Sequence, residues 1–268
     1  MPSRFDDLPR SLQDKARAAT LAGVPALMAH PDWSSPAPFV LWMHGRTAYK
    51  ELDPGRYNRW LRAGIAVCAI DLPGHGERED ERFQQPTHSL RVIRQALGEV
   101  DDVINAVEDA SFDKSRMALG GMSMGGMVTL RRLCEPHSFR CAAVEGTTGD
   151  LERLYSPLPK DNAEPWPVAH DRDDVSDLSA KTHLDGFEPL PMLALHTEAD
   201  EMVHWPGQRD FLDSLREHYE ARGADPSLVE VKTWPETGAP FEHVGFGSRS
   251  NDAKVTQTDF LSTHLGVS

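Results

Sequence analysis

The amino-acid sequence predicts an α/β fold, in which a mostly parallel central sheet carries helices on both faces and a short lid insertion. Two observations predict it. Short apolar runs alternate with stretches of helical periodicity, as in a parallel sheet covered on both sides. Polar residues and glycines follow several of those runs, where the carboxyl ends of parallel strands commonly bind ligands. The chain has 268 residues, so we expect a single domain over residues 1–268.

The elements are expected in the following order. The first segment is expected to be a helix, because apolar residues recur at helical spacing at Phe5, Leu8, Leu12, Ala16 and Ala19. Apolar runs predict strands at 24–28, 39–43, 65–70, 116–119, 141–144, 192–195 and 228–233. Helical patterns predict further helices at 88–110, 124–134, 208–221 and 256–265.

Residues 147–191 interrupt this alternation. The segment contains six prolines and an acidic run, and it falls between two expected strands, over the edge of the sheet where ligands are expected. Long irregular insertions in compact domains are usually functional or disordered. We expect a small lid, in which Tyr155 and Trp166 contact the substrate. A surface excursion without a role in binding is the alternative.

The strongest motif is LGGMSMGG, which contains Gly121-x-Ser123-x-Gly125. It follows a strand pattern and precedes a helical pattern, which is the context that this motif requires. A serine on such a tight turn has a strained backbone, and only residues with little or no side chain fit beside it. The turn also sets the hydroxyl at a helix N-terminus, which stabilises developing negative charge. We expect Ser123 to be a catalytic nucleophile; a glycine turn with a serine N-cap is the alternative.

A serine hydroxyl is a weak nucleophile and needs a general base. With this motif, the acid follows a later strand and the histidine comes near the end of the chain. His243 lies in the loop between the last expected strand and the last expected helix, so we expect it to be the base. His204 lies too near Asp200 in the sequence to fit that order, and His218 and His264 lie within expected helices.

The acid is expected at Asp200, which follows the run at 192–195 by a short loop. It would hold the histidine tautomer and stabilise the imidazolium formed during attack. Its competitors are four other carboxylates near the ends of expected strands, namely Glu145, Asp150, Glu198 and Glu201.

An oxyanion hole needs two backbone N–H donors directed at one oxygen. We expect one from Met124, directly after the nucleophile, and one from Arg46 in the loop after the run at 39–43. The Arg46 side chain is expected to pair with a surface carboxylate; an acidic group of the substrate is its alternative partner.

Composition and missing motifs exclude several classes of function. The formal net charge of −14 repels phosphate backbones and anionic lipid, so we expect neither a nucleic-acid nor a membrane partner. The sequence has no apolar core of signal-peptide length, and we expect a cytoplasmic protein. It contains no H-E-x-x-H and no glycine-rich nucleotide motif, so we expect no metal and no cofactor, although His196, Asp200 and His204 are spaced four apart.

Together these motifs resemble the α/β-hydrolase superfamily, and most of all its small serine esterases near the dienelactone-hydrolase and prolyl-oligopeptidase catalytic domains. The resemblance rests on HGR at 44–46, DLPGHG at 71–76, GMSMG at 121–125, LHTEADEMV at 195–203 and FEH at 241–243. It implies a catalytic triad of Ser123, Asp200 and His243. Dienelactone hydrolases proper use a cysteine nucleophile and prolyl oligopeptidases carry a propeller domain, and this chain departs from them in both respects.

The resemblance therefore implies a serine hydrolase that cleaves carboxylic esters through an acyl-enzyme intermediate. The insertion is too short for a large helical cap and carries apolar side chains, which favours a small-molecule ester with a short acyl chain. The alternatives are a peptidase or thioesterase that uses the same triad, and a non-catalytic binding protein on a hydrolase fold.

Overall fold

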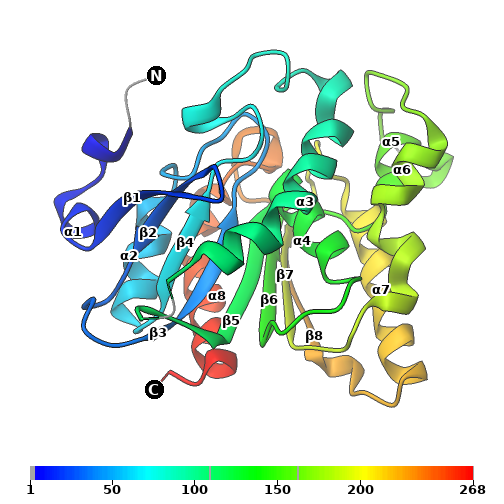
Figure 1. Ribbon diagram of the computed structural model, residues 1–268. Helices are drawn as coiled ribbons and strands as arrows, with labels where there is room; N and C mark the ends of the chain where they lie inside the picture. The colour runs from blue at the N-terminus through cyan, green and yellow to red at the C-terminus, as the bar shows by residue number, and fades with distance from the viewer. Residues whose placement is uncertain (1–3, 109, 162, 268) are drawn as a thin grey trace.

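A single eight-stranded sheet forms the centre of the computed structural model, which describes residues 4–108, 110–161 and 163–267 (Figure 1). The strands lie in the order β1-β2-β4-β3-β5-β6-β7-β8. Their bounds are β1 (Ala16–Leu21), β2 (Val24–Ala29), β3 (Ala37–Met43), β4 (Ala66–Ile70), β5 (Phe112–Met122), β6 (Cys141–Glu145), β7 (Met192–Thr197) and β8 (Val229–Trp234). Strands β3 to β8 pair in parallel, and β1 and β2 form an antiparallel edge. The predicted mostly parallel sheet is confirmed.

Helices cover both faces of this sheet, as predicted. Their bounds are α1 (Arg10–Gln13), α2 (Pro54–Arg62), α3 (Ser89–Ala106), α4 (Met124–Arg132), α5 (Leu151–Tyr155), α6 (Arg172–Leu178), α7 (Trp205–Ala221) and α8 (Ser250–Leu265). The apolar side chains of α3, α4 and α7 form one core cluster, and those of α1, α2 and α8 belong to the other. Figure 1 shows α3 in front of the strands and α8 behind them. The two clusters explain why the parallel strands are apolar on both sides: every residue of β3 is buried.

The helix predicted for the first segment is wrong beyond Gln13. Residues 16–21 form β1 instead, which pairs along its whole length with β2. Ala22 and Gly23 join the two strands in a two-residue turn, and both have positive φ angles, as the tight hairpin turns require. Pairing with β2 satisfies the backbone of this segment and outweighs the helical spacing of its alanines.

Helix α2 was not predicted from the sequence, because its segment is rich in arginine rather than in apolar residues. Local signals for its start are nevertheless present. The side chain of Asp53 accepts a hydrogen bond from the backbone N–H of Arg56, and Pro54 occupies the first helical turn. Both features are typical of a helix N-terminus.

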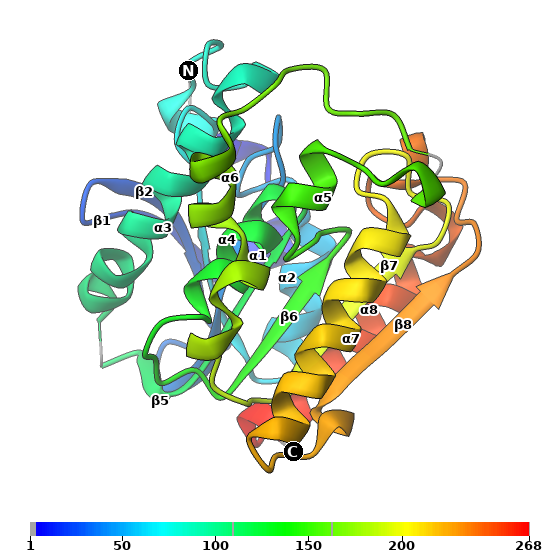
Figure 2. The same ribbon diagram turned by 90° about the vertical axis from the view of Figure 1, so that its right-hand side faces the viewer.

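The segment between β6 and β7 contains α5, α6 and two stretches of 3-10 helix, at Pro159–Asp161 and Ala180–Gly186. Figure 2 shows the chain between α5 and α6 arching over the top of the view, with α5 and α6 on the same side of the sheet as α3, α4 and α7. This is the segment predicted as a lid.

Candidate active site

Ser123 lies on a sharp turn between β5 and α4. Its backbone angles are φ 51° and ψ −119°, a strained conformation for a residue with a side chain. A Cβ atom added to Gly121 would lie 2.4 Å from the carbonyl carbon of Gly125, and one added to Gly125 would lie 2.3 Å from the oxygen of Met43. The two glycines are therefore required by close approach of the backbone, which is the physical reason for the spacing of the motif.

Three side chains from separate parts of the chain form a line of hydrogen bonds at this turn. The Nε2 atom of His243 lies 3.0 Å from Oγ of Ser123, and its Nδ1 atom lies 2.7 Å from Oδ2 of Asp200. Asp200 is buried, and the side chain of His243 is 9% exposed. The structure thus brings together the three residues that the sequence singled out as nucleophile, base and acid.

Asp200 is held in place by its own loop. Its Oδ1 atom accepts hydrogen bonds from the backbone N–H groups of Met202 and Val203, at 2.8 and 2.7 Å, which leaves Oδ2 to face His243. The buried ring of His196 lies 3.6 Å from the same Oδ2 atom, and its Nε2 is 2.8 Å from the carbonyl oxygen of Val203. Burial lowers the pKa of His196, so this ring is neutral near pH 7.

The competing carboxylates have other partners. Glu145 is buried against Arg56, with contacts of 2.5 and 2.7 Å to the guanidinium, and accepts a further hydrogen bond from Gln257. Asp150 caps α5 and forms an ion pair with Lys181 at 2.7 Å.

The two glutamates next to Asp200 in the chain, Glu198 and Glu201, are both exposed. Glu198 accepts a hydrogen bond from the hydroxyl of Thr233. In the described residues, the carboxylate that accepts a hydrogen bond from Nδ1 of His243 is Asp200 and not one of these competitors.

The two expected oxyanion donors belong to segments that meet at Ser123. Met124 is the first residue of α4, where the N–H groups of the first turn have no partner within the helix. The loop after β3 lies against the serine, since a Cβ atom added to Gly45 would be 3.2 Å from the Cβ of Ser123. Arg46 follows directly in that loop.

The expected pairing of the Arg46 side chain with a carboxylate is wrong. Its Nη1 atom donates to the carbonyl oxygen of Gln84 at 2.9 Å, and its guanidinium lies 5.8 Å from the centre of the Trp166 ring. The ion pairs found among the described residues do not include Arg46. The insertion brings Trp166 over the loop after β3, and the indole takes the place of a carboxylate as the neighbour of the arginine.

A cavity of about 350 Å³ opens at Ser123 and His243. Its other lining residues are Arg46, Thr47, Ser89, Met124, Met127, Leu154, Tyr155, Trp166, Met202, Val203, Phe241 and Val244. Tyr155 and Trp166, which the sequence assigned to substrate contact, both line this cavity. A second cavity of about 610 Å³ is lined by residues of the insertion and by Asp210 of α7, and it shares Tyr155 and Trp166 as lining residues. These two side chains therefore form the wall between the cavities.

The wall is fixed by polar contacts. The hydroxyl of Tyr155 lies 3.0 Å from Oγ of Ser89, which also lies 3.2 Å from Nε2 of His170. Trp166 donates from Nε1 to the carbonyl oxygen of Pro86 at 3.4 Å. Burial raises the pKa of Tyr155 to about 12, so its phenol is neutral. The wall thus presents an apolar surface with neutral polar ends to the site.

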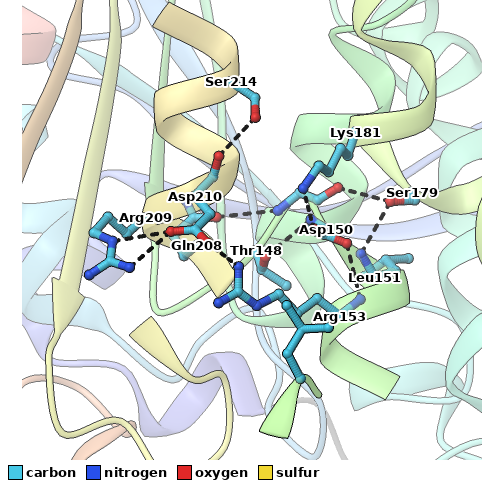
Figure 3. Close-up of polar contacts among 12 residues, drawn as sticks. Thr148, Asp150, Leu151, Arg153, Ser179, Lys181, Gln208, Arg209, Asp210 and Ser214 are labelled. Atoms are coloured by element: carbon cyan, nitrogen blue, oxygen red, sulfur yellow. Dashed lines mark hydrogen bonds and ion pairs between the residues drawn. The ribbon is translucent and has the colours of Figure 1, made fainter. Parts of the chain in front are cut away.

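Ion pairs fasten the insertion to the helices beside it. Figure 3 shows Arg153 of α5 reaching Asp210 of α7, and Lys181 reaching Asp150. Arg153 also pairs with Asp161 at 2.5 Å. The segment therefore packs against the domain and supplies one wall of the cavity; its action as a lid stays a prediction.

Several lining residues were missed in the sequence analysis. Phe241 and Val244 flank His243 in the chain, and their apolar character next to the expected base was the available signal. Ser89 and Met202 gave no signal, because each stands in an ordinary helical or loop pattern. Their place at the cavity depends on how α3 and the Asp200 loop pack.

No group of three or more His, Cys, Asp or Glu residues in the described part of the chain is arranged to hold a metal ion. No helix within the described ranges has both the length and the apolar character that crossing a membrane requires.

Comparison with known proteins adds a family and a set of structures. The sequence model of the prolyl oligopeptidase family matches residues 56–268. Esterase YjfP of Escherichia coli (strain K12) is 27% identical over 192 residues, which are 68% of this chain and 77% of the esterase.

Two crystal structures illustrate the structural likeness. TT1662 from Thermus thermophilus superimposes with a TM-score of 0.68 at 22% identity and covers 93% of this chain and 97% of its own. The acylaminoacyl peptidase of Pyrococcus horikoshii superimposes with a TM-score of 0.70 at 16% identity, over 94% of this chain and 42% of the peptidase. At these identities the superpositions show a shared fold.

Proposed function

Because this chain belongs to the prolyl oligopeptidase family, and is a hydrolase of the esterase or family-peptidase kind, we propose that it cleaves carboxylic esters through an acyl-enzyme intermediate on Ser123. The observation that carries the proposal is the line of hydrogen bonds from Ser123 through His243 to Asp200, at 3.0 and 2.7 Å. Nucleophile and base within hydrogen-bonding distance, with the base oriented by a third group, is the arrangement that activates a serine.

In the acylation step, Oγ of Ser123 attacks the ester carbonyl carbon while Nε2 of His243 takes the hydroxyl proton. Asp200 holds the proton on Nδ1 of His243, so Nε2 is free to accept, and its charge stabilises the imidazolium. The tetrahedral intermediate then collapses. The bond to the leaving alkoxide breaks, and Nε2 donates its proton to that oxygen.

The oxyanion of the intermediate is assigned to the backbone N–H groups of Met124 and Arg46. The position of Met124 at the start of α4 and the close approach of Gly45 to Ser123 support this assignment. Donors of this kind are fixed before the reaction and stabilise charge that develops in the transition state; loss of one costs about 10²–10³ in kcat in other serine hydrolases.

In the deacylation step, water takes the place that the alcohol has left. His243 accepts a proton from the water, whose oxygen attacks the acyl carbon, and returns a proton to Oγ of Ser123 as the carboxylic acid departs. The same three side chains therefore serve both halves of the reaction.

The size of the cavity supports the proposal that the substrates are small esters with short acyl chains. Its volume of about 350 Å³ is at the low end of ligand pockets, and Tyr155 and Trp166 close it on the side of the insertion. Both side chains are fixed by hydrogen bonds to the segment 86–89. We assign them to the acyl part of the substrate.

Turnover of p-nitrophenyl acetate tests the proposal. The wild type is expected to hydrolyse it and Ser123→Ala to lose the activity, with an unchanged far-UV circular dichroism spectrum. Parallel assays with an acetyl thioester and with a peptide p-nitroanilide distinguish the thioesterase and peptidase alternatives. Absence of turnover on all three substrates supports the non-catalytic alternative and contradicts the proposal.

A further inference from the structure

The residues that lead into His243 have an unusual backbone. Phe241 and Glu242 have φ angles of 56° and 48°, and neither is a glycine. Left-handed conformations of residues with side chains cost of order 1–3 kcal/mol each and persist where the surroundings enforce them. Two successive left-handed residues next to the proposed catalytic base indicate a turn whose conformation is enforced by its surroundings.

The carboxylate of Glu242 holds this turn. Its Oε2 atom accepts hydrogen bonds from the backbone N–H and the hydroxyl of Thr237, at 2.6 and 2.7 Å, and its Oε1 atom accepts one from the N–H of Gly238 at 2.7 Å. On the other side, the N–H of Glu201 donates to the carbonyl oxygen of Phe241 at 3.1 Å. The turn is thereby tied both to its own loop and to the loop that carries Asp200.

The turn directs an aromatic side chain into solvent at the mouth of the site. Phe241 is 62% exposed, more than any other large apolar side chain in the described part of the chain, and Val244 is 47% exposed. Both line the cavity that contains Ser123 and His243. Single exposed apolar residues are common, but two that flank one catalytic side chain and share its cavity form a built surface.

The chemistry of the proposed reaction says which part of the substrate meets this surface. Nε2 of His243 must donate its proton to the leaving oxygen, so the leaving group lies against the edge of the His243 ring. With the acyl part assigned to Tyr155 and Trp166, the leaving group is left with the part of the cavity wall nearest His243. Phe241 and Val244 line the same cavity and lie two positions before and one position after His243 in the chain.

We infer that Phe241, supported by Val244, is a specificity-determining platform that binds apolar, and above all aromatic, leaving alcohols. The inference rests on the proposed ester hydrolysis at Ser123 and names the class of ester that this site takes. Aromatic rings stack on one another in offset or edge-to-face arrangements, and an exposed phenylalanine ring offers such a face at little cost in side-chain entropy. The platform acts on acylation alone, because the alcohol has left before deacylation.

The test compares ethyl acetate with 2-phenylethyl acetate. The two esters share the acyl group and have primary alkyl leaving groups, and they differ by an aromatic ring. We expect the wild type to favour 2-phenylethyl acetate in kcat/KM by about tenfold, which corresponds to about 1.4 kcal/mol. Phe241→Ala is expected to reduce this preference to about twofold or less, because kcat/KM should fall more for 2-phenylethyl acetate than for ethyl acetate. Alanine keeps a Cβ atom and therefore does not relax the left-handed turn, as glycine would.

Two control variants and the deacylation rate constant separate a platform role of Phe241 from an indirect effect. Phe241→Leu keeps an apolar side chain and should hold an intermediate preference, and Val255→Ala, which removes an exposed apolar side chain from α8, should leave it unchanged. The deacylation rate of the acetyl-enzyme should be the same in the wild type and in Phe241→Ala.

Two outcomes overturn the inference. One is an undiminished preference in Phe241→Ala. The other is an equal loss of kcat/KM for both esters in Phe241→Ala together with slower deacylation, because the Phe241 side chain would then act through His243. Failure of the wild type to form an acyl-enzyme is a separate result, which contradicts the proposed function.

Discussion

The Oδ2 atom of Asp200 lies 2.7 Å from Nδ1 of His243, although 43 positions separate the two residues in the chain. The other carboxylate oxygen is occupied by two backbone N–H groups of its own loop. This division of the two oxygens fixes the orientation of the carboxylate. It also leaves the Oδ2 atom alone to orient the His243 ring.

Asp200→Asn should therefore lower kcat by up to about 10⁴, as loss of the acid does in other triads, while the fold persists. Oδ1 of the asparagine can keep the two backbone hydrogen bonds, which turns its NH₂ group toward Nδ1 of His243. The ring must then carry its proton on Nε2, where it cannot accept the proton of Ser123. Steady-state kinetics with p-nitrophenyl acetate measure the effect.

Glu198→Gln and Glu201→Gln are the matched controls for this prediction, since both side chains leave the same loop and are exposed. Neither should change kcat by more than about twofold, in keeping with surface substitutions elsewhere. Near wild-type activity in Asp200→Asn, together with inactivity of Glu145→Gln or Asp150→Asn, would place the acid after β6 and refute the assignment.

Glu145→Gln should damage stability rather than chemistry. The substitution removes the buried, bidentate carboxylate partner of Arg56 and leaves Asp53, 3.2 Å from Nε, as the remaining one. Breaking a buried pair completely costs about 3–5 kcal/mol, so we expect a loss of up to that size. Urea unfolding measures the free energy of unfolding, with the exposed Glu230→Gln as a control that should stay within about 0.5 kcal/mol of the wild type. A stable but inactive Glu145→Gln protein would run against this prediction.

Trp166→Ala should extend the range of acyl chains that the enzyme accepts. The indole is part of the wall between the cavities of about 350 and 610 Å³, so its removal joins them. Each buried methylene contributes about 0.8 kcal/mol, and two more methylenes in the enlarged cavity should raise kcat/KM by about tenfold. A series of p-nitrophenyl esters from acetate to octanoate tests this, with Trp166→Phe as the control that retains a ring. An unchanged chain-length optimum in Trp166→Ala would contradict the assigned wall.

Acid should destabilise the protein before most carboxylates titrate, and His44 is one cause. Burial lowers the pKa of His44 from 6.5 to about 4, because the charged imidazolium is poorly solvated inside the fold. Between these two values the unfolded chain binds a proton that the folded chain refuses, so the free energy of unfolding falls as the pH falls. Between about pH 7 and about pH 5, His44 alone should lower the free energy of unfolding by about 2 kcal/mol.

Urea unfolding at both pH values checks the His44 prediction. His44→Gln should be less sensitive to this pH change than the wild type, whatever its stability at neutral pH. His75 and His196 also have pKa values lowered by burial, so part of the pH dependence should remain in the variant. Identical pH dependence in the two proteins would show that His44 carries none of it.

The sequence predicted most of the sheet and the order of the site residues because both depend on local patterns. Buried parallel strands are continuous apolar runs, and the turn at Ser123 needs small residues at fixed positions. The first segment was predicted incorrectly because its alanines fit a helix equally well. Only the pairing of β1 with β2 decides between the two, and the apolar spacing within residues 16–21 does not reveal that pairing.

Other features could not be predicted because they arise from contacts between distant segments. The neighbour of Arg46 depends on where the insertion places Trp166. The exposure of Phe241 depends on a left-handed backbone that its residue type disfavours and that the Glu242 carboxylate holds in place. Sequence patterns indicate which residues are present at such a site, and packing decides which way they point.

Covalent labelling with a fluorophosphonate tests the central claim most directly. A single adduct per chain should form, peptide mapping should place it on Ser123, and both the adduct and ester hydrolysis should be lost in Ser123→Ala. An adduct on another serine, or no adduct in a preparation that hydrolyses esters, would contradict the claim that Ser123 is the nucleophile.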